Sequence, residues 1–352
     1  RAATEWLRMS QVTLNNLKGL EVAFPLGLLT TVTGVSGSGK TSLVSHALVE
    51  LVTEQLGQRL LPEPDDGDQL EHERPTASGR ITDGIGRIKR LVQVDQKPIG
   101  RTPRSNLATY TGLFDHVRRL FAATPLARAR RYDAGRFSFN VSKGRCQTCD
   151  GDGSVCVELL FLPSVYSPCP SCHGARYGEK TLEVKHEGRS VADVLSMTVD
   201  TAAEFFAQQP PLSRSLGILR DVGLGYLRLG QPATELSGGE AQRIKLATEL
   251  QTPQRGAALY VLDEPTTGLH PSDVEKLMVQ LDSLVESGHT VIVVEHDMRV
   301  VAGSDYVIDL GPGAGVAGGR IVASGAPAEV AAASTPTAKY LARFLRDPVR
   351  AA

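Results

Sequence analysis

Three groups of residues in this chain have types and spacings that could do chemistry. Residues 34–41 read Gly-Val-Ser-Gly-Ser-Gly-Lys-Thr, which satisfies every fixed position of the phosphate-binding pattern G-x-x-x-x-G-K-[ST]. Residues 260–265 read Tyr-Val-Leu-Asp-Glu-Pro, an apolar run that leads into two carboxylates. Between these groups, two Cys-x-x-Cys pairs have the spacing of a zinc site. Together they predict nucleotide chemistry in a chain that also holds a metal.

The first group predicts a nucleotide site. The β-branched run Leu28–Val35 precedes the loop and a helical pattern, Ser42–Leu61, follows it, which is the context that the motif requires. The loop glycines let backbone N–H groups converge on phosphate at a helix N-terminus, which a chance glycine-rich turn would not do. We expect Lys40 to reach the β- and γ-phosphates of ATP and Thr41 to bind Mg²⁺. The predicted phosphate-binding residues are Gly34, Ser36, Gly37, Gly39, Lys40, Thr41 and Ser42.

The second group predicts hydrolysis of the nucleotide. Asp263 ends an apolar strand, where open α/β sheets bind ligands, and we expect it to hold Mg²⁺ through water. Glu264 is placed to polarise the attacking water. A lone histidine after a strand is more often structural, but His296 follows the run Thr290–Val294 at the right place in this series. We therefore expect His296 to contact the γ-phosphate and Gln96, after another strand, to sense it.

Residues 236–243, Leu-Ser-Gly-Gly-Glu-Ala-Gln-Arg, are the signature of ABC-type ATPases. The segment Ser237, Gly238 and Gly239 opens a predicted helix, Glu240–Leu250, so its free N–H groups and the helix dipole suit a γ-phosphate. A plain serine cap would look similar but would not explain the Gly-Gly and Gln-Arg that accompany it. The signature predicts that two ATPase units close on ATP, each completing the site of the other.

The four paired cysteines predict a closed, structural zinc site. Four thiolates saturate a tetrahedral Zn²⁺, so we expect no catalytic position on the metal. Redox or disulfide chemistry is the alternative. His173 could replace one thiolate, Cys156 is expected to be an unligated thiol, and Val155–Tyr166 is predicted to be a hairpin arm. The predicted zinc ligands are Cys146, Cys149, Cys169 and Cys172.

A basic stretch lies just upstream of the zinc module. Within residues 118–145 one acidic residue, Asp133, stands against many cations, and Phe137 and Phe139 lie among them. This favours a nucleic-acid surface, although a solvated basic helix face would have the same composition. The cations are Arg118, Arg119, Arg128, Arg130, Arg131, Arg136, Lys143 and Arg145.

The bulk composition limits the function classes. The 352 residues carry a formal net charge of -1, so any DNA-binding surface must be local. No apolar run reaches the roughly 18 residues that span a bilayer, so we expect no membrane partner. The chain has five cysteines, of which four are paired by spacing, and in a cytosolic ATPase this pattern indicates metal binding and not disulfides. The chain starts with Arg1 and lacks a signal peptide, which suggests a piece of a longer protein.

The predicted fold class is α/β, a P-loop NTPase of the ABC-ATPase type with a helical signature-domain insertion that carries a four-cysteine zinc module. We expect three stretches along the chain. Residues 1–98 form the first part of the ATPase core, in which the polar stretch 62–86 is expected to be flexible. Residues 99–231 form the insertion, with the zinc module at 140–180 and helices near 112–130 and 191–220. Residues 232–352 form the second part of the core.

The order of these motifs resembles the UvrA family, and the resemblance runs from about Trp6 to Leu345. The stretch Gly-Arg-Thr-Pro-Arg-Ser-Asn, at 100–106, belongs to that family and not to transporter ATPases. The most specific matching segments are Val35–Lys40, Asp95–Gln96, Pro98–Asn106, Gly135–Asn140, Cys146–Gly153 and Leu236–Arg243.

The resemblance is to the C-terminal half of UvrA and implies damage recognition in bacterial nucleotide excision repair. It implies an N-terminal ABC unit in the same polypeptide, a UvrB-like partner docked there, and a cytoplasmic homodimer on double-stranded damaged or drug-modified DNA. It also implies that Cys146, Cys149, Cys169 and Cys172 bind Zn²⁺ and that the hairpin between them approaches DNA.

Two departures from the family pattern keep an alternative open. Lys97 and Leu107 stand where the repair protein usually has Ser and Pro, and Leu246–Leu250 looks like shorter UvrA-like paralogues, some of which serve drug self-resistance. A transporter ATPase subunit would not need the cysteine insertion, and a zinc-dependent chaperone-like module would not need the ATPase motifs. No aromatic residue is clearly placed to stack on adenine, and Trp6 and Phe24 are the candidates.

Overall fold

The computed structural model describes residues 1–57, 76–159, 162–251 and 256–347. They divide into two compact units: unit 1 is Arg1–Asp95 with Pro253–Ala352, and unit 2 is Gln96–Thr252. The expected boundary at residue 232 differs from this division, because the signature segment belongs to unit 2. Its helix α9 (Gly238–Gln251) packs against α8 (Pro210–Asp221) of the same unit.

Unit 1 is built on a six-stranded sheet in the order β11-β10-β3-β9-β8-β5. All neighbouring strands run parallel except β10 and β11. The central strands β3, β8 and β9 are buried along almost their whole length, as parallel strands covered on both faces must be. The strands are β3 (Leu29–Gly34), β5 (Arg90–Val94), β8 (Ala258–Asp263), β9 (Thr290–Val294), β10 (Tyr306–Gly311) and β11 (Arg320–Gly325).

Helices cover both faces of this sheet. Neighbouring residues of β10 show the two sides, since Ile308 joins the core under the helical segment that follows the phosphate loop, while Val307 packs with α11, α12 and α13. The predicted helix Ser42–Leu61 is a wide π-type segment, Ser42–Leu48, that continues into α1 (Val49–Gln55). It stops early because Gly57 takes a left-handed conformation (φ 62°), and residues 58–61 lie outside the described part. The other helices are α10 (Pro271–Glu286), α11 (Met298–Gly303), α12 (Pro327–Ala331) and α13 (Pro336–Arg346).

A second, antiparallel sheet of unit 1 has the order β2-β1-β4. It consists of β1 (Trp6–Leu14), β2 (Leu17–Pro25) and β4 (Ser78–Asp83). The expectation that 62–86 is a flexible excursion is wrong for β4, whose backbone pairs with β1. The polar sequence of β4 is that of an exposed edge strand, in which Ile81 alone is half-buried among apolar neighbours. Residues 62–75 of that prediction lie outside the described part.

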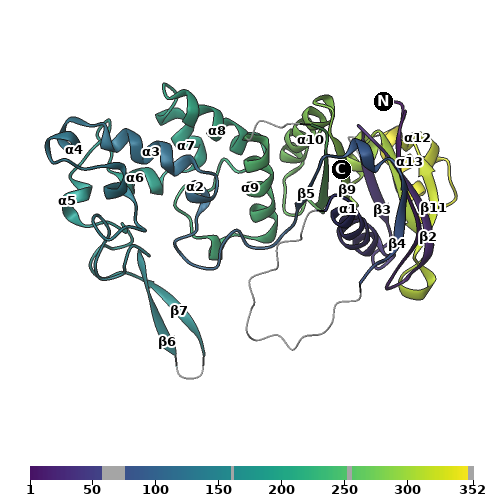
Figure 1. Cartoon of the computed structure of the whole chain (residues 1–352), viewed down its shortest axis with the longest axis horizontal. Helices are drawn as coiled ribbons and strands as arrows, with labels where there is room; N and C mark the ends of the chain where they lie inside the picture. Colours follow the sequence, from purple (N-terminus) through teal and green to yellow (C-terminus); the bar gives the residue numbers. More distant parts are fainter. Residues whose placement is uncertain (58–75, 160–161, 252–255, 348–352) are drawn as a thin grey trace. The chain divides into compact units, whose positions relative to one another are not determined.

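Unit 2 is helical except for a two-stranded arm, β6 (Ser154–Leu159) and β7 (Leu162–Pro168), which matches the predicted hairpin (Figure 1). The two helical stretches expected near 112–130 and 191–220 are each broken into shorter helices. Two of the three breaks lie at Thr124 and Thr198, each of which accepts a hydrogen bond as the N-cap of a new helix, and the third lies before Pro210, the first residue of α8. The helices are α2 (Leu107–Tyr110), α3 (Leu113–Ala122), α4 (Pro125–Ala129), α5 (Glu179–Leu182), α6 (Val191–Ser196) and α7 (Val199–Phe205), besides α8 and α9.

The helices of the structure can be compared with the length that a membrane span requires. Among the described residues, the helices are all too short or too polar to cross a lipid bilayer.

Candidate functional site

The phosphate loop connects β3 to the helical segment that starts at Ser42. Gly34 has φ 132°, and a side chain there would meet the carbonyl oxygen of Leu310 at 2.0 Å, so only glycine fits. Lys40 Nζ donates to the carbonyl oxygens of Gly34 and Val35, both at 3.0 Å. The ammonium group therefore lies over the loop, where the motif predicts it to meet phosphate.

The electrostatics around Lys40 suit an anionic ligand. Burial lowers the pKa of Lys40, while the nearby carboxylates of Glu264, Asp263 and Asp309 act in the opposite direction. Asp263 and Glu264 come from the end of β8 and the phosphate loop follows β3, and both strands pair in parallel with β9, so these groups lie at one edge of the sheet. This is the edge at which open α/β sheets bind ligands.

Asp263 ends β8, and its Oδ2 accepts a hydrogen bond from Ser45 Oγ at 2.7 Å. Ser45 lies one helical turn after Thr41 and is only slightly exposed. The motifs do not single out Ser45, and its only sequence signal is that spacing from the predicted Mg²⁺ ligand. The contact orients the carboxylate that would bind Mg²⁺-bound water.

Glu264 and His296 follow adjacent strands, and Asp263 pairs in register with Val294. His296 Nδ1 lies 3.8 Å from Glu264 Oε1, and their side chains are 68% and 43% exposed. Glu264 has φ 47°, a left-handed conformation that is uncommon for a residue with a side chain. The structure thus brings together two groups that the sequence predicts for hydrolysis, and both are open to water and ligand.

Gln96, Ser237, Gly238 and Gly239 all belong to unit 2. Gln96 lies beside the start of α9, since a side chain on Gly238 would be 3.2 Å from Gln96 Oε1. Ser237 Oγ donates to Glu240 Oε2 at 2.9 Å and accepts from the N–H of Glu240. The signature serine is therefore a helix cap in this structure.

Tyr226 completes this group, although no motif points to it. Its hydroxyl donates to Glu240 Oε1 at 2.6 Å. Burial and this bond raise the pKa of Tyr226 to about 12. For Glu240, hydrogen bonds from Tyr226 and Ser237 outweigh the effect of burial and lower the carboxyl pKa. The charged form of Glu240 is thus the one that holds the signature cap together.

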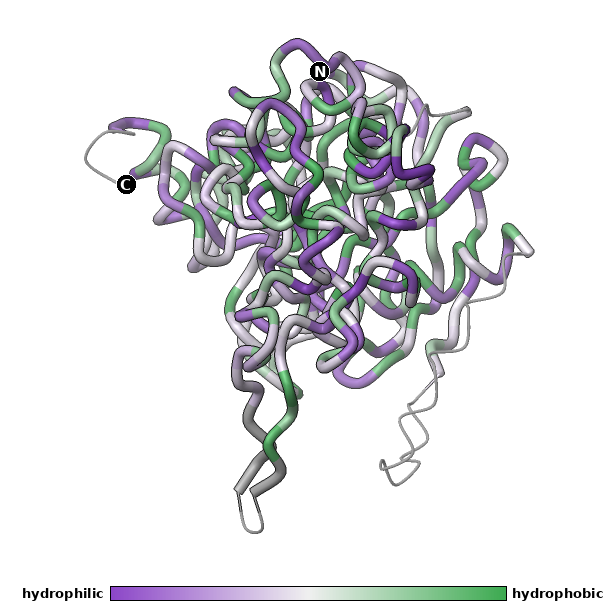
Figure 2. Tube along the Cα trace, turned by 90° about the vertical axis from the view of Figure 1, so that its left-hand side faces the viewer, coloured by the Kyte–Doolittle hydropathy of each residue, from purple (hydrophilic) through white to green (hydrophobic). Residues whose placement is uncertain are grey.

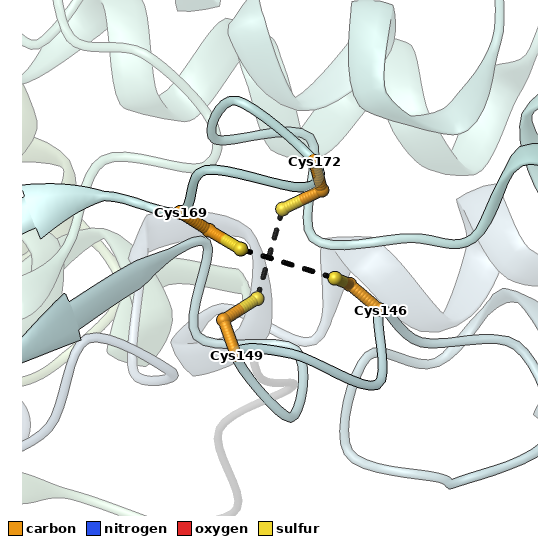
Figure 3. A group of neighbouring side chains, drawn as sticks. All are labelled: Cys146, Cys149, Cys169 and Cys172. Atoms are coloured by element: carbon orange, nitrogen blue, oxygen red, sulfur yellow. Dashed lines mark hydrogen bonds between the residues drawn. The ribbon is translucent and has the colours of Figure 1, made fainter.

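The four predicted zinc ligands point toward one centre (Figure 3). All four Sγ atoms lie within 4.8 Å of one another, with 4.0 Å between Cys146 and Cys169 and 3.6 Å between Cys149 and Cys172. A tetrahedral Zn²⁺ with bonds of about 2.3 Å would hold its sulfurs about 3.8 Å apart. The cysteines are free, so the geometry favours a metal over the disulfide alternative.

Burial and mutual contact change the pKa values of the thiols. For Cys169, burial acts against ionisation, but N–H groups of Cys172 and Ser171 and the neighbouring thiols lower the pKa to about 7. Burial raises the pKa of Cys172 to about 12 and also raises that of Cys149. Four thiolates would repel one another in this buried place, so a divalent cation is needed to hold them.

Each Cys-x-x-Cys pair forms a tight turn, here called a knuckle. In the first knuckle the backbone passes so close to a neighbouring segment that one position requires glycine. Gly151 has φ 88°, and a side chain there would meet the carbonyl oxygen of Phe139 at 2.1 Å. Cys156 is exposed on β6 and stands outside the thiol cluster. His173 is also outside this cluster and is exposed.

Arg176 anchors the zinc module and was not predicted from the sequence. It is buried, and its guanidinium donates to the carbonyl oxygens of Pro103 and Gly230 at 3.0 and 3.3 Å. Arg104, in the family-specific stretch 100–106, forms an ion pair with Asp152 of the first knuckle. The module is thereby fixed to the segment that follows Gln96 and to the loop that leads to the signature.

The basic stretch is less positive than its sequence suggests. Phe137 and Phe139 are buried, so they offer no stacking surface. Arg136 lies over the ring of Tyr132. Among the described residues, three of these cations are exposed and form no ion pair: Arg128, Arg131 and Lys143. Three of the other arginines form the ion pairs Arg118–Asp115, Arg130–Glu183 and Arg145–Asp150.

The described part of the arm has exposed side chains. Val157 and Tyr166 are 44% and 54% exposed, and Figure 2 shows a hydrophobic stretch on the described part of the arm.

The structure also bears on the two candidates for stacking on adenine, Phe24 and Trp6. Phe24 is fully buried and cannot stack on a base, and Trp6 packs edge-on against Tyr306.

Comparison with known proteins adds a second line of evidence. No protein-family model matches the chain. The chain is 53% identical over 333 residues to UvrABC system protein A of Micrococcus luteus, covering 94% of this chain and 32% of that protein. It is 51% identical to the protein of the same name from Methanothermobacter thermautotrophicus, covering 99% of this chain and 35% of the relative. The chain thus spans about a third of the length of the curated relatives it matches.

One solved structure has the same fold at high identity. The crystal structure of UvrA2 from Deinococcus radiodurans matches with a TM-score of 0.88 and 61% identity, covering 97% of this chain and 40% of that one. The predicted fold class is confirmed: an α/β P-loop NTPase of the ABC type with an inserted helical unit that carries the four-cysteine module.

Proposed function

Because the chain belongs to the UvrA family, we propose that it is an ATP-binding and ATP-hydrolysing part of a DNA-damage recognition protein of nucleotide excision repair. The observation that carries the proposal is the meeting of Lys40, Asp263, Glu264 and His296 at one edge of a parallel sheet. The relatives named above are UvrABC proteins and UvrA2, so the drug-resistance and transporter alternatives gain no support.

Each residue of this site has a role that its chemistry suits. ATP and Mg²⁺, when bound, supply the phosphoryl group and a cation that stabilises its charge. Lys40 and the loop N–H groups hold the phosphates, and Thr41 and Asp263 hold the metal and its water. Glu264 accepts the proton of the attacking water, and His296 donates a hydrogen bond toward the γ-phosphate. Gln96 would sense the γ-phosphate, and the segment Ser237–Gly239 would complete the site of a second cassette.

The zinc module serves the DNA-binding side of the function. Cys146, Cys149, Cys169 and Cys172 would hold Zn²⁺, which would rigidly cross-link the two Cys-x-x-Cys segments. We propose double-stranded damaged DNA as the partner, with Arg128, Arg131 and Lys143 as the exposed cations beside the module. From family membership we also propose an N-terminal ABC unit, a homodimer, a UvrB-like partner and a cytoplasmic location.

Nucleotide-dependent DNA binding tests this proposal. The complete natural protein should bind damaged duplex DNA with an affinity that changes between ATP and ADP, because the cassette cycle alters the DNA-binding surface. A fluorescence-anisotropy titration with lesion-containing and undamaged duplexes measures the affinity. Equal affinity for both duplexes would contradict damage recognition, and ATP hydrolysis that survives Glu264→Gln unchanged would contradict the assigned site.

A further inference from the structure

We infer that Glu295 is a positioning residue for ATP hydrolysis, because its buried carboxylate ties the turn that carries Glu264 to the turn that carries His296. The inference rests on the proposed ATPase function of this site. Glu295 lies between β9 and His296, and the sequence motifs give it no role of its own. All the groups involved belong to unit 1.

Glu295 is completely buried, and its two carboxylate oxygens serve two different turns. Oε1 accepts hydrogen bonds from the N–H and the hydroxyl of Thr266, at 2.9 and 2.6 Å. Oε2 accepts from the N–H groups of His296 and Asp297, at 3.0 and 3.3 Å. One side chain thus links the loop after β8 to the loop after β9.

The first of these turns holds an unfavourable backbone conformation. Glu264 has φ 47°, and such a conformation persists in a residue with a side chain only where its surroundings enforce it. Three contacts do so here: Glu264 N–H donates to Val294 O, Thr267 N–H donates to Glu264 O, and Thr266 donates twice to Glu295. The first two contacts join backbone groups only, so the link between Thr266 and Glu295 is the one that mutation can remove.

A carboxylate is the group that this place requires. All four partners are donors, and a carboxylate accepts on both oxygens, whereas the amide of glutamine has one acceptor oxygen and one donor nitrogen. In Glu295→Gln the amide NH₂ would face N–H groups at one of the two turns. Aspartate has one methylene less and could not reach both. The four charge-assisted hydrogen bonds offset the cost of burying the charge.

The linked turns determine the relative position of the two predicted hydrolytic groups. Glu264 Oε1 and His296 Nδ1 lie 3.8 Å apart, and both would act on the same water and phosphate. A displacement of about 1 Å at a reacting centre can cost about a hundredfold in rate. The four hydrogen bonds of the Glu295 carboxylate reach neither Lys40 nor Thr41 of the phosphate loop. Loss of the link should therefore lower kcat without a matching change in KM for ATP.

Steady-state ATP hydrolysis by the complete natural protein tests the inference. The ATP hydrolysis rate of Glu264→Gln measures the activity that comes from outside this site. This rate is subtracted from the rates of wild type and of the other variants. We expect Glu295→Gln to lower kcat about tenfold or more, with KM for ATP within about threefold of wild type. Thr266→Val removes one of the four bonds and nearly preserves shape, and should lower kcat about two- to fivefold.

The outcomes separate the inference from the proposed function. If wild type and Glu264→Gln hydrolyse ATP equally, the proposed function fails and the inference falls with it. If those two differ but Glu295→Gln keeps the wild-type kcat, the inference alone is overturned. A loss shared equally by kcat and ATP affinity would indicate general damage to the fold and would also overturn it. Should Glu295→Gln not fold, an unchanged kcat in Thr266→Val overturns it.

Discussion

The nucleotide site of unit 1 and the thiol cluster of unit 2 are built in opposite ways. Lys40, Asp263, Glu264 and His296 come from distant parts of the chain and meet because β3, β8 and β9 are neighbours in one sheet. The four cysteines come from two short knuckles joined by the arm, and their sulfurs point at one another. The first site is held by a large core, whereas we expect the second to depend on a bound metal ion.

This difference shows where each site is vulnerable. Buried strands and backbone hydrogen bonds hold the nucleotide site, so single side chains there can be changed with loss of chemistry alone. In the thiol cluster the buried residues are largely the cysteines themselves, packed with Val155. Removing one ligand there should remove the structure as well.

The largest expected effect is therefore loss of the metal. Cys169→Ser removes a buried ligand, and we expect zinc to fall from one to none per chain, with loss of hydrogen-exchange protection across 146–176. Inductively coupled plasma mass spectrometry measures the metal. Retention of one zinc per chain would break the comparison.

The same variant supplies the control in unit 1. ATP affinity at the phosphate loop should change by less than about threefold, because the core of unit 1 does not include the thiol cluster. Exchange of Cys156 for serine should leave the zinc content unchanged, since this cysteine is exposed on β6 and outside the cluster.

Lys40→Ala should have the largest effect on ATP binding. Loss of a charged partner of phosphate costs about 3 kcal/mol, which corresponds to about a hundredfold in ATP affinity. Isothermal titration calorimetry measures the affinity, and the melting temperature should stay close to that of wild type. Unaltered affinity would contradict the phosphate-loop assignment.

Glu264→Gln should separate binding from chemistry. Removal of a general base lowers the rate by about a hundredfold or more, while the near-identical shape of glutamine leaves ATP binding in place. Single-turnover hydrolysis and nucleotide titration measure the two quantities. A parallel loss of hydrolysis and of ATP binding would mean that Glu264 stabilises the fold of its turn and does not act as the general base.

The smallest expected effect concerns the basic surface of unit 2. Neutralising Arg128, Arg131 and Lys143 together should weaken DNA binding several-fold. It should also reduce the slope of log affinity against log salt by about one for each phosphate that the protein no longer neutralises. Neutralising Arg118, Arg130 and Arg145, which are already in ion pairs, should reduce that slope less. An equal reduction in both triple variants would show that the ion pairs do not matter.

The sequence predicted those residues whose chemistry fixes their type and spacing. Lys40, Asp263, Glu264 and the four cysteines are of this kind, and the structure gathers each group as expected. Ser45, Arg176, Tyr226 and Glu295 could not be predicted, because each acts through a contact that only the tertiary fold creates.

The incorrect expectations have the same cause. The count of charges over residues 118–145 did not include Glu183 and Asp150. These residues lie outside that range and form ion pairs with Arg130 and Arg145. Strand β4 looked like a flexible segment because an edge strand needs few apolar residues. Phe139 looked available for stacking, yet it packs against Phe114 and Tyr177.

The central claim is that a nucleotide bound at the phosphate loop of unit 1 controls the affinity of the zinc-bearing unit 2 for DNA. Its most direct test is the affinity of the complete natural protein for a lesion-containing duplex, measured with ATP, with ADP and without nucleotide, in wild type and in Lys40→Ala. We predict that the affinity differs at least several-fold among the three states of the wild type and that this difference is lost or strongly reduced in Lys40→Ala. Identical affinities in all three wild-type states would contradict the account.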